Sequence, residues 1–166
     1  KSKYILVTSH RAQNVDNKDN LAKVLDIIKQ VSDATNRKAV WSIHPRTKDR
    51  IKRFNLSIPK EIIASPPLGY FDFLKLIKNS FLTLTDSGGV QEESCTLNVP
   101  CITIRESTER QETVLLGYNH MVGLDQEKVS KALKIITSNK NMIWKNPYGD
   151  GNSASNIIDI IGNLLK

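Results

Sequence analysis

The 166-residue sequence lacks the features of a membrane protein, a disulfide-bonded domain or a metal-binding domain. No apolar run approaches the ~20 residues that a helix needs to cross a bilayer, so we expect no membrane segment. The only two cysteines, Cys95 and Cys101, have neither metal-ligand spacing nor a neighbouring histidine. We interpret both as buried apolar side chains in a reducing environment, which predicts a cytoplasmic protein without a metal.

Several nucleotide-binding and catalytic motifs are also missing. No GxGxxG sequence follows the first predicted strand and no GxxxxGK[ST] sequence occurs, so neither NAD nor a P-loop nucleotide is supported. There is no nucleophile elbow. The composition, 39% hydrophobic and 25% charged, is nevertheless that of a globular protein, and the length is sufficient for one well-buried domain.

The net charge of +7 favours an anionic partner such as a nucleotide, a nucleic acid or a lipid surface. Its lysines are scattered through four of the seven predicted helices, however, which is also the pattern of ordinary solvated faces. Only 6% of the residues are aromatic, and they do not alternate with basic residues in the way that stacks bases. We therefore expect no nucleic-acid partner.

Short apolar runs alternate with segments whose apolar residues recur at helical spacing. The predicted strands lie at 4–9, 39–44, 61–65, 82–85, 101–105 and 119–123. The predicted helices lie at 21–34, 47–54, 70–80, 87–97, around 114–116, at 126–138 and at 153–165. This alternation predicts an α/β fold, a doubly wound (Rossmann-like) parallel sheet of about six strands, within residues 1–152, followed by a last helix within 153–166.

The segment 82–93 is predicted to be a buried strand that stops at small residues and is followed by an acidic helix. Ser87-Gly88-Gly89 stands at the predicted helix start, where unpaired N–H groups and the positive end of the helix dipole bind anions such as phosphate. Glu93 lies about one helical turn further on and can face the same ligand. An equally open interpretation is an ordinary strand-to-helix turn in which Asp86 or Ser87 caps the helix.

Polar residues follow several of the predicted strands. Since the carboxyl ends of parallel strands share one edge, these residues can converge on one ligand. Arg110 suits a phosphate or sugar oxygen, while His10 can donate to a phosphate or transfer a proton near neutral pH. We favour a functional role for His10 because it stands beside Arg11 and in register with the Ser-Gly-Gly turn, whereas for His44 an ordinary loop residue is an equal alternative. The sequence thus predicts half of a nucleotide-diphosphate site.

Five segments, in order and with matching spacing, resemble the non-hydrolysing UDP-N-acetylglucosamine 2-epimerases, and specifically the carboxyl-terminal domain of that family. They run from the first predicted strand to the last helix: Val7-Thr8-Ser9-His10-Arg11 with Asn14, His44-Pro45-Arg46, Asp86-Ser87-Gly88-Gly89-Val90-Gln91-Glu92-Glu93, Thr108-Glu109-Arg110-Gln111-Glu112 and Asn146-Pro147-Tyr148-Gly149-Asp150-Gly151.

The resemblance implies the second half of a glycosyltransferase-B-like fold, in which a UDP-sugar binds between two Rossmann-like halves. It implies an isomerase of polysaccharide biosynthesis that interconverts UDP-N-acetylglucosamine and UDP-N-acetylmannosamine by anti elimination of UDP followed by its re-addition. No cofactor is expected. The implied partners are UDP or UDP-N-acetylglucosamine, a missing amino-terminal domain, and a second copy in a homodimer.

The resemblance also assigns roles to matching positions. His10 would be catalytic, assisting the departure and return of the diphosphate. Arg11 and His44 match positions that touch an activating second UDP-N-acetylglucosamine in bacterial members. The UDP-binding positions would be Phe73 with its backbone at the uracil, Ser87, Gly88 and Gly89 at the diphosphate, Glu93 at the ribose hydroxyls, and Arg110 near the phosphates or sugar.

The chain departs from the family pattern in two respects. Many bacterial members read His-Arg-Arg-Glu at the first motif, whereas this chain has His10-Arg11-Ala12-Gln13 and so loses a cation and a carboxylate at the place tied to the activator. The catalytic carboxylates of the family lie in the amino-terminal domain. We therefore expect this chain alone to bind UDP weakly and not to epimerise UDP-N-acetylglucosamine, and we expect the helix within 153–166 to pack toward that domain.

Other functions remain open from the sequence. One alternative is the hydrolysing 2-epimerase, which releases N-acetylmannosamine and UDP. The others are a glycosyltransferase of the same architecture and a non-catalytic nucleotide-binding module.

Overall fold

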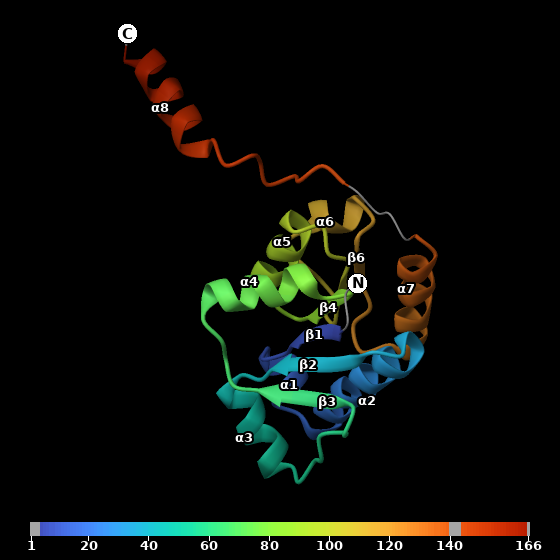
Figure 1. Ribbon diagram of the computed structural model, residues 1–166. Helices are drawn as coiled ribbons and strands as arrows, with labels where there is room; N and C mark the ends of the chain where they lie inside the picture. Colours follow the sequence, from blue (N-terminus) through green and yellow to red (C-terminus); the bar gives the residue numbers. More distant parts are fainter. Residues whose placement is uncertain (1–3, 140–143, 166) are drawn as a thin grey trace.

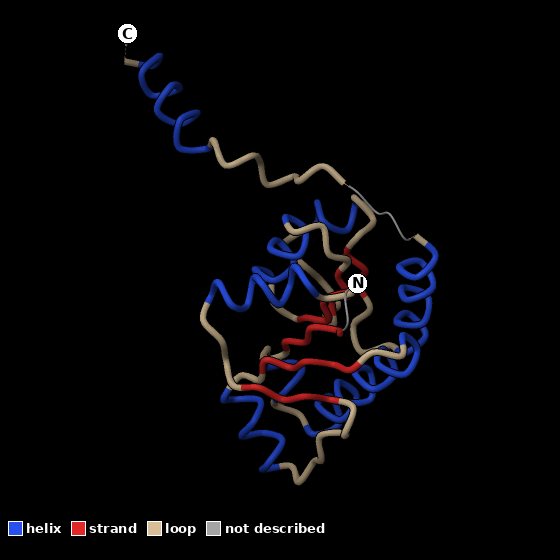
Figure 2. Tube along the Cα trace, viewed as in Figure 1, coloured by secondary structure: helices blue, strands red, loops and turns tan. Residues whose placement is uncertain are grey.

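The computed structural model describes residues 4–139 and 144–165. These residues form an α/β fold in which one sheet lies between layers of helices (Figures 1 and 2). All strand pairs are parallel, and the six strands have the order β3-β2-β1-β4-β5-β6. The predicted doubly wound parallel sheet is therefore confirmed. The predicted ranges 1–152 and 153–166 also include residues 1–3, 140–143 and 166, which lie outside the described residues.

The elements alternate along the chain. The strands are β1 Tyr4–Thr8, β2 Lys38–Ser42, β3 Ile62–Ser65, β4 Leu82–Thr85, β5 Cys101–Thr103 and β6 Asn119–Met121. The helices are α1 Ala12–Val15, α2 Lys18–Thr35, α3 Pro45–Arg53, α4 Tyr70–Asn79, α5 Gly88–Thr96, α6 Gln111–Leu115, α7 Gln126–Ser138 and α8 Ser153–Leu164. No described helix is both long and apolar enough to cross a bilayer.

Alternate residues of the central strands supply two separate cores, because successive strand side chains point to opposite faces. Ile5 and Val7 of β1 join the larger core beneath α2 and α7. Leu6, between them, joins the smaller core beneath α4 and α5, with Ile77 and Val90. Both faces of the sheet are therefore covered, which explains why the sequence of β1 is a continuous apolar run rather than an alternating one.

Some helices begin at residues other than the predicted ones. Pro45 does not merely end the preceding strand: it occupies the first position of α3, where its missing N–H costs nothing, and the helix begins before the predicted residue 47. The Nδ1 atom of His44 caps this helix by accepting from the N–H of Arg46 at 3.1 Å. The segment predicted as a polar loop after β1 contains α1, which buries Asn14 and Val15.

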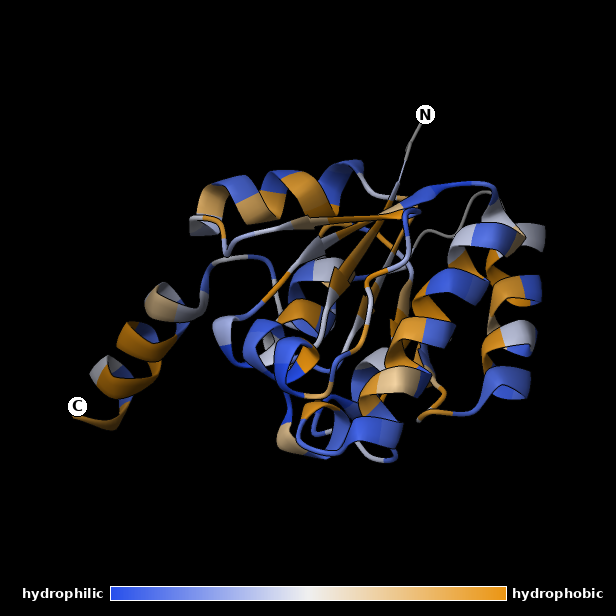
Figure 3. Ribbon diagram, turned by 90° about the horizontal axis from the view of Figure 1, so that it is seen from below, coloured by the Kyte–Doolittle hydropathy of each residue, from blue (hydrophilic) through white to orange (hydrophobic). Residues whose placement is uncertain are grey.

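The last helix, α8, has no buried residue although much of it is apolar (Figure 3). Ile158 is 68% exposed and Leu164 is 79% exposed. In Figures 1 and 2 the helix projects away from the sheet. The folded body nevertheless includes Trp144, whose ring stacks on Tyr118 at 4.2 Å and whose Nε1 donates to the carbonyl of Cys95 at 2.9 Å.

Removing α8 should leave the stability of this chain almost unchanged. Truncation after Asn152 deletes no buried side chain, so we expect the free energy of unfolding in urea to change by less than about 0.5 kcal/mol. As a control, Trp144→Ala should lower it by about 2 kcal/mol, because a stacked, half-buried ring is lost. A truncation that costs as much as Trp144→Ala would mean that α8 packs on the body.

Candidate functional site

The strands β1 and β4 are neighbours at the centre of the sheet, and the chain proceeds outward from them in both directions. Such a switch in strand order creates a crevice beyond the carboxyl ends of the strands, where ligands bind in doubly wound sheets. Thr8 pairs with Thr85 at these ends, and their hydroxyl oxygens lie 2.6 Å apart. The segments after β1 and after β4 therefore begin side by side.

Asp86, the first residue after β4, is fully buried. Its carboxylate accepts hydrogen bonds from the N–H groups of His10 and Arg11, the hydroxyl of Ser9 and the amide of Asn14, at 2.9 to 3.1 Å. The suggestion that Asp86 caps α5 is therefore wrong, because its oxygens bind the segment after β1 instead. This carboxylate fixes the course of the segment that carries His10.

Helix α5 begins without a side-chain cap. Ser87 is its N-cap residue, but its hydroxyl forms no capping hydrogen bond. The helix itself offers no acceptor to the N–H groups of its first turn. Gly88 is buried and Gly89 is exposed at this start. Unsatisfied N–H groups and the positive end of the helix dipole here provide the chemistry of an anion-binding site.

The segment after β5 lies beside this helix start. A Cβ atom on Gly88 would lie 3.8 Å from Oε2 of Glu109 and 4.0 Å from Cζ of Arg110. Arg110 forms an ion pair with Glu92, while Arg105 donates two hydrogen bonds to Glu109 at 2.8 and 2.9 Å. These bonds from Arg105 lower the pKa of Glu109 to about 2, so Glu109 is an anion at neutral pH. The structure thus brings Arg110 to the Ser-Gly-Gly turn, already paired with a carboxylate of the chain.

A polar network beneath α5 holds this arrangement together. The Oε1 atom of Gln91 accepts from the hydroxyl of Thr108 at 2.7 Å and from the amide of Asn119 at 3.0 Å. Its Nε2 atom donates to the carbonyl of Ser87 at 3.3 Å. The Thr108 hydroxyl in turn accepts from the N–H of Arg110 at 3.0 Å. Sequence reasoning missed this role of Gln91, for which the only signal was a polar residue between small residues on a buried helix face.

His10 and His44 lie together beyond the carboxyl ends of the strands, which we call the rim, with ring centroids 5.5 Å apart. The Nδ1 atom of His10 lies 3.4 Å from Oδ1 of Asp86, and the His10 side chain is 40% exposed. His44 is exposed and its side chain caps α3, so this residue has a structural function in the fold. Arg11 is exposed and close enough to Glu109 to lower the pKa of that carboxyl further.

Phe73 and Glu93 come from the two helices that cover the smaller core. The Phe73 ring is half-buried and packs against that core, which leaves its backbone rather than its ring for a ligand. Glu93 is half-buried on α5. Burial raises the pKa of Glu93 above its usual 4.5, and the neighbouring Glu92 carboxylate raises it further. Glu93 is thus a carboxylate held in a partly dehydrated place.

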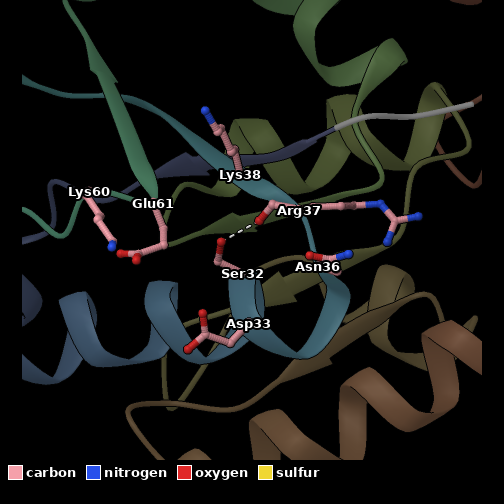
Figure 4. Close-up of a pocket in the computed structure, with 7 residues that line it drawn as sticks. All are labelled: Ser32, Asp33, Asn36, Arg37, Lys38, Lys60 and Glu61. Carbon is pink, nitrogen blue, oxygen red and sulfur yellow. Dashed lines mark hydrogen bonds between the residues drawn. The ribbon is translucent and has the colours of Figure 1, made fainter.

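A pocket of about 630 Å³ lies at the amino-terminal ends of β2 and β3, beside the end of α2 (Figure 4). Polar and charged side chains line it, among them Asp33, Lys60 and Glu61. The hydroxyl of Ser32 donates to the carbonyl of Arg37 at its edge. None of the predicted site residues lines this pocket, so it is separate from the rim that carries His10 and Ser87.

Within residues 4–139 and 144–165, no group of three or more His, Cys, Asp or Glu side chains is placed to hold a metal ion. Cys95 and Cys101 are buried free thiols, as predicted. Burial raises the pKa of Cys101 to about 11, so this thiol is protonated and unreactive at neutral pH.

A family model described as UDP-N-acetylglucosamine 2-epimerase matches residues 1–162. The chain belongs to this family. The match includes the rim after β1, the start of α5 and the segment with Arg110, so the resemblance that rested on separate motifs is confirmed across nearly the whole chain.

Relatives in the epimerase family share both sequence and fold with this chain. The UDP-N-acetylglucosamine 2-epimerase of Methanocaldococcus jannaschii is 49% identical over 162 residues, covering 95% of this chain and 44% of that protein. Its structure in complex with UDP-GlcNAc and UDP matches with a TM-score of 0.88 at 48% identity, covering 98% of this chain and 46% of that one. A Pseudomonas aeruginosa UDP-2,3-diacetamido-2,3-dideoxy-D-glucuronate 2-epimerase is 32% identical over 161 residues, covering 97% of this chain and 45% of that protein. The chain thus spans less than half the length of these relatives.

The raised pKa of Glu93 predicts that its charge opposes folding of this family member. The pKa of this acid is higher in the folded than in the unfolded chain, so the free energy of unfolding decreases as the pH rises from the unfolded-state pKa to the folded-state pKa. Glu93→Gln should therefore increase the free energy of unfolding at pH 7, and the gain should disappear well below pH 4.5, where both states are protonated. Urea titrations at both pH values measure this. Asp26→Asn, at an exposed site on α2, is the control for a general charge effect, and an equal gain there would contradict the prediction.

Proposed function

We propose that this chain is the UDP-binding, carboxyl-terminal domain of a UDP-N-acetylglucosamine 2-epimerase, an isomerase that forms UDP-N-acetylmannosamine by elimination and re-addition of UDP. The observation that carries the proposal is the uncapped start of α5 at the β1/β4 switch point, with Arg110 and His10 beside it. The match to a relative whose structure is described as a complex with UDP-GlcNAc and UDP supports it.

In the proposed complex, the N–H groups at Ser87-Gly88-Gly89 bind the diphosphate, and Arg110 exchanges Glu92 for a phosphate oxygen. Glu93 accepts from the ribose hydroxyls, and the backbone of Phe73 contacts the uracil. As the bond between sugar C1 and the diphosphate oxygen breaks, the electron pair leaves with UDP and His10 donates from its ring to a phosphate oxygen. The C2 proton goes to a carboxylate outside this chain, giving 2-acetamidoglucal. A proton then adds to the opposite face of C2 as UDP adds back to C1, which completes the epimerisation.

The rest of the proposed enzyme is an amino-terminal half, since relatives are more than twice as long as this chain. We propose that α8 packs on that half, because its apolar side chains are exposed here. The whole protein would act as a homodimer in the cytoplasm, which agrees with two buried free thiols. Arg11 and His44 would touch an activating second substrate molecule, without the cation and carboxylate that many bacterial members add at positions 12 and 13.

The sugar is the less specific part of this proposal. The Pseudomonas aeruginosa relative is named for a different sugar on the same uridine diphosphate, yet it matches 97% of this chain. We therefore assign the described residues to the uridine diphosphate and leave the choice of sugar to the other half.

Loss of Glu93 should weaken UDP binding more than loss of the Ser87 hydroxyl does. Glu93→Ala removes charged hydrogen bonds to ribose, so the binding free energy should fall by about 1–3 kcal/mol. Ser87→Ala should cost less, because the helix N–H groups remain. Calorimetric titration of the chain with UDP measures both. Unchanged affinity of Glu93→Ala would remove this residue from the site, and a larger loss for Ser87→Ala would contradict the phosphate placement.

The chain alone should bind UDP but form no product. The proposed base for the C2 proton lies outside it, so incubation with UDP-N-acetylglucosamine, followed by proton NMR, should show unchanged substrate. Detectable turnover would contradict the proposal. In a protein that joins this chain to an amino-terminal half, UDP-N-acetylmannosamine is the expected product, whereas free N-acetylmannosamine would identify the hydrolysing reaction.

A further inference from the structure

We propose that Asp86 is a positioning residue for His10: it keeps the proton of the neutral imidazole on Nδ1 and so presents Nε2 to the ligand. The identity of that ligand, the departing diphosphate, rests on the proposed function. The control of the ring itself rests only on contacts within this chain.

The two oxygens of Asp86 have different surroundings. Oδ2 accepts from the hydroxyl of Ser9 at 2.9 Å, from the N–H of Arg11 at 3.0 Å and from the amide of Asn14 at 3.0 Å. The N–H of His10 lies 3.0 Å from Oδ2 and 3.1 Å from Oδ1. Oδ2 is therefore saturated, whereas Oδ1 keeps an acceptor site, and the Nδ1 atom of His10 lies 3.4 Å from it.

A carboxylate can only accept hydrogen bonds, which decides the tautomer of the ring beside it. With the proton on Nδ1, the ring N–H of His10 faces Oδ1 at 3.4 Å, which is a favourable electrostatic contact. With the proton on Nε2, the lone pair of Nδ1 would face the buried negative charge without an intervening hydrogen. The contact therefore selects the Nδ1–H form and leaves Nε2 as the atom that exchanges a proton with the ligand.

His44 provides an internal contrast only 5.5 Å away. Its Nδ1 atom accepts from the N–H of Arg46 at 3.1 Å, so its neutral ring carries the proton on Nε2. Two histidines at the same rim are thus held in opposite tautomers by different partners. A general property of the rim, such as its charge, would affect both rings alike and does not explain this difference.

The tautomer completes the proposed proton balance. In the charged ring both nitrogens carry protons; Nε2 gives its proton to a phosphate oxygen as the C1–O bond breaks, and the neutral ring keeps its proton on Nδ1 against Asp86. On re-addition of UDP, the same proton returns to Nε2. Asp86 remains a carboxylate throughout and touches neither UDP nor sugar.

The test is nitrogen NMR of the ring atoms in the chain labelled with ¹⁵N-histidine, recorded at a pH where the rings are neutral. Three histidines are present, and single substitutions assign their signals. We expect His10 as the Nδ1–H tautomer and His44 as the Nε2–H tautomer. An Nε2–H tautomer for His10 in the unmodified chain would overturn the proposal without any variant.

Asp86→Asn makes the test sharper, because the hydrogen-bond donors around Oδ2 fix the orientation of the new side-chain amide. Ser9, Arg11 and Asn14 require an acceptor at that position, so the amide oxygen must take the place of Oδ2 and the NH₂ group must face His10. The amide then donates to Nδ1, and the His10 tautomer should invert to Nε2–H while His44 stays unchanged. Ser9→Ala, which removes a donor from Oδ2 only, is the matched control and should leave the His10 tautomer as it was.

The outcomes separate this proposal from the proposed function. If Asp86→Asn only lowers the thermal stability and leaves the His10 tautomer unchanged, Asp86 has a structural role and the positioning role is overturned. If UDP fails to bind the unmodified chain, the proposed function fails whatever the tautomer is. In a full-length enzyme containing this chain, Asp86→Asn should lower kcat at least about 100-fold and change KM less than threefold. A KM that rises by the same factor by which kcat falls would contradict a role confined to the ring.

Discussion

The carboxylate of Asp86 is the point on which the rim of this fold depends. An ion without partners in the interior costs several kcal/mol, so the donors around it are obligatory. Each hydrogen bond to a charged group contributes roughly 1.5–3 kcal/mol, and the donors from Ser9, His10, Arg11 and Asn14 together can offset that cost. They do so only if the chain after β1 folds back over the end of β4. The geometry of the His10 segment is therefore imposed by a residue of another strand.

The second constraint is electrostatic balance at the start of α5. Arg105 and Arg110 are each paired with a carboxylate of the chain, Glu109 and Glu92. A phosphate that binds at Gly88 must compete with these carboxylates, one of which lies beside that glycine. The net charge of +7 thus says little about the site, because cations far from the rim do not set the field there. In the proposed complex, anion binding depends on the exchange of these ion-pair partners for phosphate and on the uncapped start of α5.

The sequence allowed most of the elements to be predicted because they carry their own periodicity: α7 begins and ends where the spacing of its apolar residues predicted, whereas the short α1 was expected to be a loop. The order of the strands was not predictable in the same way, since an apolar run does not specify its neighbour. Asp86 shows the limit most clearly. Its partners lie 72 to 77 residues earlier in the chain, so local reasoning offered only the nearest helix, with Asp86 or Ser87 as its cap. For His44 the sequence left a functional residue and an ordinary loop residue as equal alternatives, and its capping role was missed because it depends on a helix that starts at a proline.

Convergence at the rim was predictable for a different reason. Parallel strands place their carboxyl ends on one edge whatever their order, so residues that follow separate strands must meet there. Which of them meet depends on the order: β1 and β4 are adjacent, and this adjacency, rather than the motifs, brings His10 beside the start of α5. The same logic explains why the site is open. A crevice at a switch point has walls from one sheet only, so a ligand held there exposes its far side, and in the proposed enzyme the sugar and its C2 proton are on that side. The proposal thereby divides nucleotide binding and sugar chemistry between two halves of the enzyme, which would explain how a similar half can occur in relatives named for different sugars.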